Sequence, residues 1–233
     1  MPRLARAVIP GVAHHVTQRG NRRMPVFFGD DDRRRYLALV AQGCAKAQVR
    51  CLAWCLMDNH VHLILVPADP DGLRAALGEA HRRYTRAVNR REGWTGYLFQ
   101  GRFASYPMDD AHLMAAVRYV ERNPVAAGLV GAAGDWLWSS ARSHIAGKRG
   151  RDDPLTDLAA LSDAVPQWRT MLELGLEAGA LEGDGVLLAD AIEQRLRTGR
   201  PLGTASWIAR QEGELGRNLM PARRGRKATG GKL

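Results

Sequence analysis

The spacing of apolar side chains changes along the first 125 residues, and this change predicts where strands and helices lie. Apolar residues alternate with polar ones in half-buried strands and recur about every 3.6 residues in helices that bury one face. The first pattern predicts a strand over residues 13–20. Two apolar stretches joined at a hairpin-type Asp-Asn junction predict strands over 49–57 and 60–67, and an extended segment is expected over 97–108, where Gly101 interrupts it. The second pattern predicts helices over residues 30–48, 71–93 and 109–125.

Polar residues and a proline mark the ends of the third predicted helix. Asp109 or Asp110 is expected to cap its first turn, because a carboxylate accepts hydrogen bonds from the free N–H groups there. Pro124 is expected to end it near Asn123, since proline disfavours a helical conformation in the preceding residue.

The order of elements is strand, helix, strand, strand, helix, strand, helix. This order predicts an α+β fold with a ferredoxin-like split βαβ core, in which helices cover one face of an antiparallel sheet. The third helix is then an addition that must pack against this core.

Charge divides the chain into segments. Residues 1–150 carry 22 Lys and Arg against 12 Asp and Glu (net +10), residues 151–194 carry 2 against 10 (net −8), and residues 195–233 carry 10 against 2 (net +8). We expect one domain over 1–150, an acidic then basic helical extension over 151–220 with a short helix at 206–216, and a disordered basic tail over 221–233. The basic body and tail favour a polyanionic partner, most simply nucleic acid.

Cysteine usage and hydropathy indicate a reduced, cytoplasmic protein. Cys44, Cys51 and Cys55 are an odd number without zinc-ribbon spacing, and we expect Cys51 and Cys55 on one face of a strand. No apolar run approaches the roughly 18 residues of a membrane span, so we expect no membrane segment. Pro10 and Gly11 break the short apolar stretch near the N-terminus, so we expect no signal peptide.

Two histidines interrupt the apolar strand within residues 56–65, LMDNHVHLIL. His60 and His62 are two residues apart, so both imidazoles leave one face of the strand, while Val61 and Leu63 leave the other. Two neutral imidazoles side by side form half of a divalent metal site. The alternative is a pair of core histidines that hydrogen-bond their neighbours.

Other polar residues near the histidine pair, or on the first predicted strand, give less specific predictions. Asp58 and Asn59 are expected to form the turn before His60, and the alternative is that they support the two histidines. His14 and His15 are adjacent, so they face opposite sides of their strand, and no role is predicted for either.

The third predicted helix supplies groups that the histidines lack. Tyr119 and Asn123 are four residues apart, so they share one helical face. Asn123 offers an oxygen to a hard cation, and Tyr119 offers a phenol that becomes a nucleophile once a metal or base helps to remove its proton. A metal at His60, His62 and Asn123 would polarise a phosphodiester that Tyr119 attacks. The alternative is that Tyr119 is an aromatic side chain that the helix buries in the core.

Four stretches together carry a family resemblance: HHVTQRGNRRMPVFF, CLMDNHVHLIL, YLFQGRF and VRYVERNPVAAGLV. The HVH triplet is the histidine–hydrophobic–histidine pattern, and the set resembles the REP-associated tyrosine transposases, which are relatives of the single-tyrosine insertion-sequence transposases. The resemblance covers residues 10–145 closely, and the end of the chain resembles an extension found in some members.

The resemblance implies a metal-dependent endonuclease and strand transferase for single-stranded DNA hairpins. It implies that His60 and His62 bind Mg²⁺ or Mn²⁺ and that Tyr119 forms a 5′-phosphotyrosine intermediate and frees a 3′-hydroxyl. The smaller insertion-sequence relatives have glutamine at the position of Asn123, so Asn123 either ligates the metal or braces the helix end. Those relatives assemble their sites across a dimer, whereas in this chain the extension is an alternative cover for that surface, so both a monomer and a dimer are compatible with the sequence.

Basic residues in three regions are expected to contact DNA, although solvated surface is the alternative for each. They are Arg19, Arg22, Arg23, Arg82, Arg83, Arg86, Arg102, Arg223, Arg224, Arg226 and Lys227. Tyr97, Phe99 and Phe103 are expected either to stack on bases or to pack in the core.

Two other functions are compatible with the sequence. One is a hairpin-binding regulator that keeps the fold but performs no chemistry. The other is a metal phosphodiesterase that uses water, for which Tyr119 would be dispensable.

Overall fold

The computed structural model describes residues 6–162, 165, 167–173 and 188–220, and it has an α+β fold around one antiparallel sheet. The first strands and α-helices are, in chain order, β1 (Ala13–Arg19), α1 (Asp30–Lys46), β2 (Arg50–Met57), β3 (His60–Val66), α2 (Gly72–Glu92), β4 (Ala104–Met108) and α3 (Asp110–Ala126). The strand order is β2-β3-β1-β4, and all neighbouring strands are antiparallel. This is the split βαβ arrangement, so the predicted fold class is confirmed.

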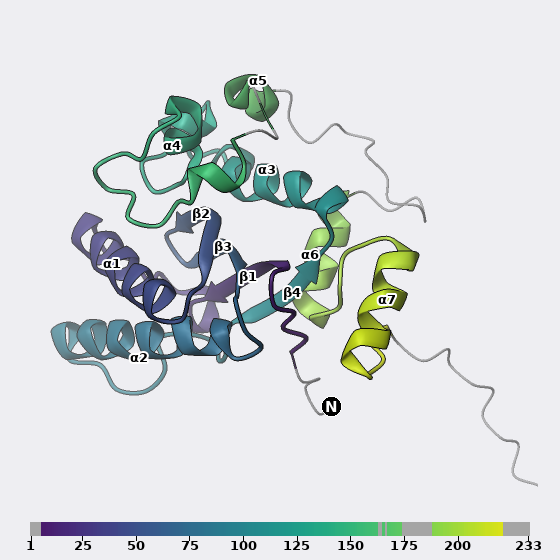
Figure 1. The fold of residues 1–233 in the computed structure, drawn as a ribbon. Coiled ribbons are helices and arrows are strands. Elements are labelled where there is room, and N and C mark those ends of the chain that lie inside the picture. The colour runs from purple at the N-terminus through teal and green to yellow at the C-terminus, as the bar shows by residue number, and fades with distance from the viewer. Residues whose placement is uncertain (1–5, 163–164, 166, 174–187, 221–233) are drawn as a thin grey trace, which may run out of the picture.

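One face of the sheet is covered by α1 and α2 (Figure 1). Trp54 and Leu63 from the strands pack there with Tyr36 from α1, and all three side chains are almost fully buried. The two helices approach closely at Gly43, where a Cβ atom would lie 2.1 Å from the carbonyl oxygen of Ala76. A side chain at Gly43 would therefore force the helices apart.

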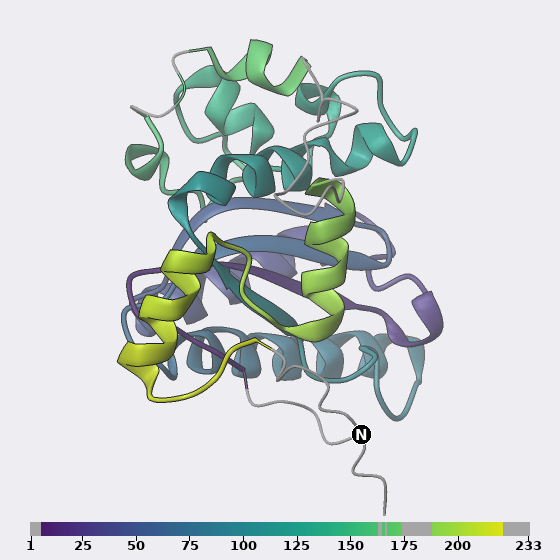
Figure 2. The same cartoon turned by 90° about the vertical axis from the view of Figure 1, so that its right-hand side faces the viewer.

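The opposite face is covered by α3, which lies above the sheet in Figure 2. Val117 and Val120 of α3 pack against Ile64 of β3 and Tyr106 of β4. Because both faces are covered, β3 is buried at every residue after His60, which explains its continuous apolar sequence. The helix begins as predicted, since the Asp109 side chain accepts a hydrogen bond from the N–H of residue 112.

Both edges of the sheet are covered by later parts of the chain. The N–H of Leu56 in β2 donates to the carbonyl of Trp138 (2.8 Å), and the N–H of Leu202 donates to the carbonyl of Pro107 in β4 (3.0 Å). These contacts satisfy backbone groups that an edge strand would otherwise expose. They also place the C-terminal extension beside β4.

The later helices are α4 (Ala141–Ala146), α5 (Trp168–Glu173), α6 (Leu188–Thr198) and α7 (Ala205–Leu215). Helix α6 contacts β1, β4 and α3, and α7 is the short helix predicted near residues 206–216. Within the described ranges, no helix is both long enough and apolar enough to cross a membrane. The basic tail over 221–233 lies outside the described residues.

The predicted end of the third helix is wrong. Helix α3 continues through Pro124 to Ala126. Proline removes one N–H donor, but the next bonds of the ladder still form, including the one from the Ala127 N–H to the Asn123 carbonyl (3.0 Å). Asn123 is therefore an internal helix residue whose side chain shares a face with Tyr119.

The predicted placement of two cysteines on one face is also wrong. A β-bulge between Cys51 and Ala53 shifts the register of β2. Because a bulge adds one residue to the alternation, Cys51 packs under α1 and α2 while Cys55 packs under α3. Both thiols are buried and free.

Candidate active site

His60 and His62 leave β3 on the face of the sheet that α3 covers. Their ring centroids lie 4.9 Å apart, with the ring planes nearly perpendicular. Arg19 and Thr17 of β1 lie directly opposite them in the sheet register, so all four side chains project to the same side. The predicted same-face histidine pair is therefore present, at the junction of β1 and β3.

The Nδ1 atom of each histidine is engaged by a neighbouring side chain. His60 Nδ1 lies 2.6 Å from Asn59 Oδ1, and His62 Nδ1 lies 2.9 Å from His15 Nε2. His15 Nδ1 in turn lies 3.0 Å from the Tyr106 hydroxyl. A hydrogen bond at Nδ1 fixes the ring and leaves Nε2 as the atom available to a metal. The alternative interpretation of Asn59, support for the histidines, therefore fits the geometry.

His15 is a site residue that sequence reasoning missed. Its position on the face opposite to His14 was foreseen, but its partner was not, because the pairing of β1 with β3 decides it. His15, Thr17 and Arg19 follow the two-residue spacing of a strand, so they share the face on which His60 and His62 lie. That spacing, combined with the ferredoxin-like strand order, is the signal that could have found it.

Burial keeps these imidazoles uncharged. It lowers the pKa of His15 to about 3. Burial and the nearby charge of Arg19 lower the pKa of His60 to about 4, against the opposite effect of a hydrogen bond with Asn123. The pKa of His62 lies well below its usual 6.5, again chiefly because of burial. Since a metal binds only the neutral imidazole, both histidines of the pair are in the ligating form at neutral pH.

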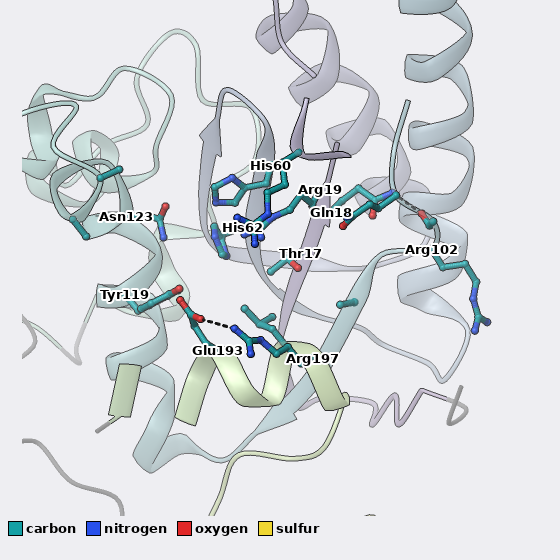
Figure 3. A pocket seen from close by; sticks show the side chains of 17 residues that line it. Thr17, Gln18, Arg19, His60, His62, Arg102, Tyr119, Asn123, Glu193 and Arg197 are labelled. Atoms are coloured by element: carbon teal, nitrogen blue, oxygen red, sulfur yellow. Dashed lines mark hydrogen bonds and ion pairs between the residues drawn. The ribbon is translucent and has the colours of Figure 1, made fainter. Parts of the chain in front are cut away.

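Tyr119 and Asn123 project from α3 toward the histidine pair (Figure 3). The Tyr119 ring centroid lies 5.8 Å from that of His62 and 6.0 Å from that of His15, both in edge contact. Burial raises the pKa of the Tyr119 phenol, as does the neighbouring Glu193, while Arg19 acts in the opposite direction. The histidines, the tyrosine and the asparagine that the sequence singled out thus meet in one place, within a single chain.

These residues line a cavity of about 910 Å³. Arg19, Arg23 and Arg102 line it too, so three of the predicted DNA contacts surround the predicted chemistry. Among the described residues, no three His, Cys, Asp or Glu side chains form a group that could hold a metal. A metal at the histidine pair would therefore need a third ligand of another type, and the amide oxygen of Asn123, which lines the same cavity, is a candidate.

Helix α6 closes one side of the cavity with Glu193, Leu196 and Arg197, none of which was predicted. The Glu193 carboxylate lies 3.4 Å from the Arg197 guanidinium (Figure 3). Both side chains are more than half exposed, so water screens this ion pair. No motif marks α6 as part of a site, because only the packing of the extension against β4 brings it there.

A second groove, of about 830 Å³, adjoins the first and shares Gln18, Gln100, Gly101 and Arg102 with it. It is lined by Arg82 and Arg86 of α2 and by Tyr97, whose side chain is 87% exposed. Phe99 and Phe103 also border this groove but are buried at 5% and 6% exposure, so core packing is their main role. The two cavities form one basic path from the histidine pair to α2.

The other predicted DNA contacts lie apart from this path. Arg22 is exposed in a short 3₁₀ turn (Asn21–Arg23), where its φ of 52° is in the left-handed region. Arg83 points toward α1, and its Nη1 donates to Gln42 Oε1 at 3.1 Å. The tail residues Arg223, Arg224, Arg226 and Lys227 lie outside the described residues.

The buried histidines predict that acid destabilises the fold. His14, His60 and His81 have a pKa of about 4 in the folded chain against 6.5 when exposed. The unfolded chain therefore takes up protons first as the pH falls, so the free energy of unfolding should fall from about pH 6.5 toward pH 4. Each lowering of a pKa from 6.5 to about 4 corresponds to about 3 kcal/mol.

Denaturant unfolding at several pH values checks this expectation. His81→Gln, which changes a buried histidine away from the pair, should make the pH dependence shallower. A free energy of unfolding that stays constant between neutral pH and pH 5 would contradict the burial of these neutral rings.

The fold and the cavity define a class of α+β proteins in which a histidine pair on a central strand faces a tyrosine on a covering helix. Residues 9–123, just under half of the chain, match the family model described as "Transposase IS200 like". The matched residues include His60, His62 and Tyr119, and they end at Asn123.

The fold is similar to that of a solved structure described as a REP-associated tyrosine transposase bound to a REP hairpin. The TM-score is 0.55 at 22% sequence identity, covering 68% of this chain and 93% of that one. A second structure, of a candidate transposase from Deinococcus radiodurans R1, has a TM-score of 0.37 at 20% identity and covers 52% of this chain and 97% of that one. The chain has no match among curated protein sequences.

Proposed function

We propose that the protein is a metal-dependent endonuclease and strand transferase that acts on hairpins in single-stranded DNA. The observation that carries this proposal is the meeting of His60, His62, Tyr119 and Asn123 in one arginine-lined cavity. The match of residues 9–123 to the IS200-like transposase family model supports chemistry on DNA. The REP hairpin bound by the protein of similar fold supports a hairpin substrate.

Tyr119 is the proposed nucleophile. Its phenol oxygen attacks the phosphorus of a DNA phosphodiester, and the bond from phosphorus to the 3′-oxygen breaks. The phenol proton leaves as the new bond forms, and the departing 3′-oxygen takes up a proton to become a 3′-hydroxyl. One phosphate ester replaces another, so the 5′-phosphotyrosine link retains the energy of the broken bond. A different 3′-hydroxyl can attack this link later.

The residues around Tyr119 meet the needs of this step. Burial raises the pKa of its phenol, so a free phenolate is scarce at neutral pH and nearby positive charge must favour it. Arg19 supplies part of that charge, since it lowers the pKa of Tyr119. Arg19 also lies opposite His60 in the sheet register, where it can contact the phosphate under attack.

The donor set fits a divalent cation, which we propose to be Mg²⁺ or Mn²⁺. His60 and His62 would bind it, with Asn123 as the third protein ligand, while Asn59 and His15 hold the two imidazoles in orientation. When bound, the cation acts as a Lewis acid on the phosphate. The site is built from one chain, so a monomer can hold all of its proposed parts.

The basic path is the proposed DNA surface. Arg19, Arg23 and Arg102 lie where the cleaved strand would enter, and Arg82 and Arg86 would follow its backbone along α2. The exposed ring of Tyr97 is placed to stack on an unpaired base. Arg22, Arg83 and the basic tail are proposed as further phosphate contacts outside this path.

Changing Arg82 and Arg86 together to Glu is expected to weaken hairpin binding and to flatten its dependence on salt. Each lost phosphate contact lowers the slope of log affinity against log salt by about 0.9 for duplex DNA and slightly less for single strands. Fluorescence anisotropy of a labelled hairpin over a series of salt concentrations measures both effects.

Arg83→Glu is the matched comparison, because this residue lies on the same helix but donates to Gln42 of α1, so its proposed phosphate contact lies outside the groove. It should change the affinity and the salt slope less than Arg82→Glu or Arg86→Glu does as a single substitution. Equal losses for Arg83 and Arg82 would mean that the groove is no special path and that only net charge matters.

A further inference from the structure

Glu121 is a buried carboxylate on α3 that the proposed chemistry does not use. It lies between Tyr119 and Asn123 in the sequence, and its side chain is fully buried. Residues two apart on a helix point about 200° away from each other, so Glu121 leaves the side of α3 opposite to the cavity. A buried carboxylate is costly unless hydrogen bonds satisfy it, so its partners matter.

Three donors from outside α3 surround this carboxylate. Oε1 accepts hydrogen bonds from Ser140 Oγ and from His144 Nδ1, both at 2.6 Å, and Oε2 accepts one from Trp168 Nε1 at 2.7 Å. The Trp168 ring also stacks on the His144 ring, with centroids 4.1 Å apart. Glu121 therefore joins α3 to α4 and to α5.

The same group of contacts reaches the sheet. Ser140 Oγ accepts a hydrogen bond from the N–H of Trp54 in β2 at 2.9 Å. Apolar contacts such as those of Val117 and Val120 hold α3 on the sheet but constrain its rotation weakly, because they are not directional. Hydrogen bonds to the oxygens of a carboxyl group, by contrast, are directional. Three of them at one position fix the rotation of α3 about its axis.

We propose that Glu121 is a positioning residue for catalysis. Its bonds to Ser140, His144 and Trp168 hold α3 at the rotation that presents Tyr119 and Asn123 to the histidine pair. The region that contains α4 and α5 then has a function of its own as a brace for the catalytic helix. This inference rests on the proposed function, since it assigns a role in the step that Tyr119 performs.

Glu121→Gln tests the inference. Glutamine keeps the size of the side chain, and its oxygen at the Oε1 position still accepts from Ser140 and His144. Its amide nitrogen at the Oε2 position cannot accept from Trp168 Nε1, which therefore loses its acceptor. Asp153→Asn is the matched control, because Asp153 is also a buried carboxylate and accepts from Trp54 Nε1 (3.1 Å) and Ser143 Oγ (2.5 Å) without touching α3. Both variants should lower the melting temperature.

Two measurements separate positioning from stability. In hydrogen exchange, the amides of α3 should exchange faster in Glu121→Gln than in Asp153→Asn at matched stability. In single-turnover cleavage with saturating hairpin and metal, Glu121→Gln should react at least about tenfold more slowly, because small misplacements of a nucleophile are costly. Its hairpin affinity should stay near that of the wild type, and Asp153→Asn should keep both rate and affinity.

A second variant tests the assignment of the donors. Trp168→Phe keeps a ring to stack on His144 but removes the N–H that Oε2 accepts. Added to Glu121→Gln, it removes the donor left without an acceptor, so the double variant should recover part of the lost rate.

The outcomes distinguish this inference from the proposed function. Unchanged exchange of α3 in Glu121→Gln, or a rate equal to that of Asp153→Asn, would overturn the positioning role. A wild-type protein that forms no adduct would instead contradict the proposed function, and the exchange of α3 would still decide whether Glu121 fixes the helix.

Discussion

Tyr119→Phe is expected to abolish the covalent protein–DNA adduct while hairpin binding stays unchanged. Phenylalanine keeps the ring that contacts His62 and His15 but lacks the attacking oxygen. Removal of a nucleophile typically lowers the rate by at least about a thousandfold. Denaturing gels of labelled hairpin DNA measure the adduct, and anisotropy measures the binding.

Tyr97→Phe is the matched control for this experiment. Tyr97 is also exposed to the basic path but lies in the adjoining groove, so its hydroxyl should be dispensable and the adduct should form as in the wild type. An adduct that persists in Tyr119→Phe would place the nucleophile elsewhere and remove the main reason for the role given to α3.

His60→Ala is expected to abolish metal-dependent cleavage with little loss of stability. His60 is less buried than His62, so its removal leaves a smaller cavity in the core. The loss of one of two imidazole ligands should lower the affinity for Mn²⁺ by more than the roughly 10–100-fold typical of the groups that orient ligands. Calorimetric titration of Mn²⁺ and cleavage assays at increasing metal concentration measure the two effects.

His14→Ala serves as the control, since His14 is a buried histidine whose Nε2 accepts from the N–H of Ile9, outside the cavity. It should bind Mn²⁺ as the wild type does, whatever its stability. Equal metal affinity in the His60→Ala variant and the wild type would show that the histidine pair is a packing feature of the sheet.

These two variants also separate the proposed function from its alternatives. A metal phosphodiesterase that uses water would cleave hairpins without an adduct, and Tyr119→Phe would leave that cleavage intact. A hairpin-binding regulator would bind DNA in all three proteins and cleave it in none.

The local pattern of the sequence predicted the fold because it reflects how each element is buried. The helix α1 buries one face and is apolar on that face, whereas β3 is covered on both faces and is apolar at nearly every position. Local exceptions were not visible in the pattern. The bulge after Cys51 and the continuation of α3 through Pro124 both depend on backbone hydrogen bonds that periodicity does not encode.

The histidine pair and Tyr119 with Asn123 could be predicted because each pair follows the repeat of its own element. Only the fold shows how the two pairs meet. The same holds for the residues that surround them. His15 acts through a strand pairing and Glu193 through the packing of a late helix, so neither can be found from local spacing alone. Glu121 shares a helix with Tyr119, yet its role depends on Ser140, His144 and Trp168.

Mapping of the DNA-linked residue shows whether Tyr119 is the nucleophile. Wild-type protein is incubated with a hairpin oligonucleotide and Mn²⁺ or EDTA, the adduct is digested, and mass spectrometry locates the nucleotide on the chain. We expect a phosphotyrosine at Tyr119 that forms only with the metal. Metal-dependent cleavage with no linked residue, or a link at another tyrosine, would contradict it.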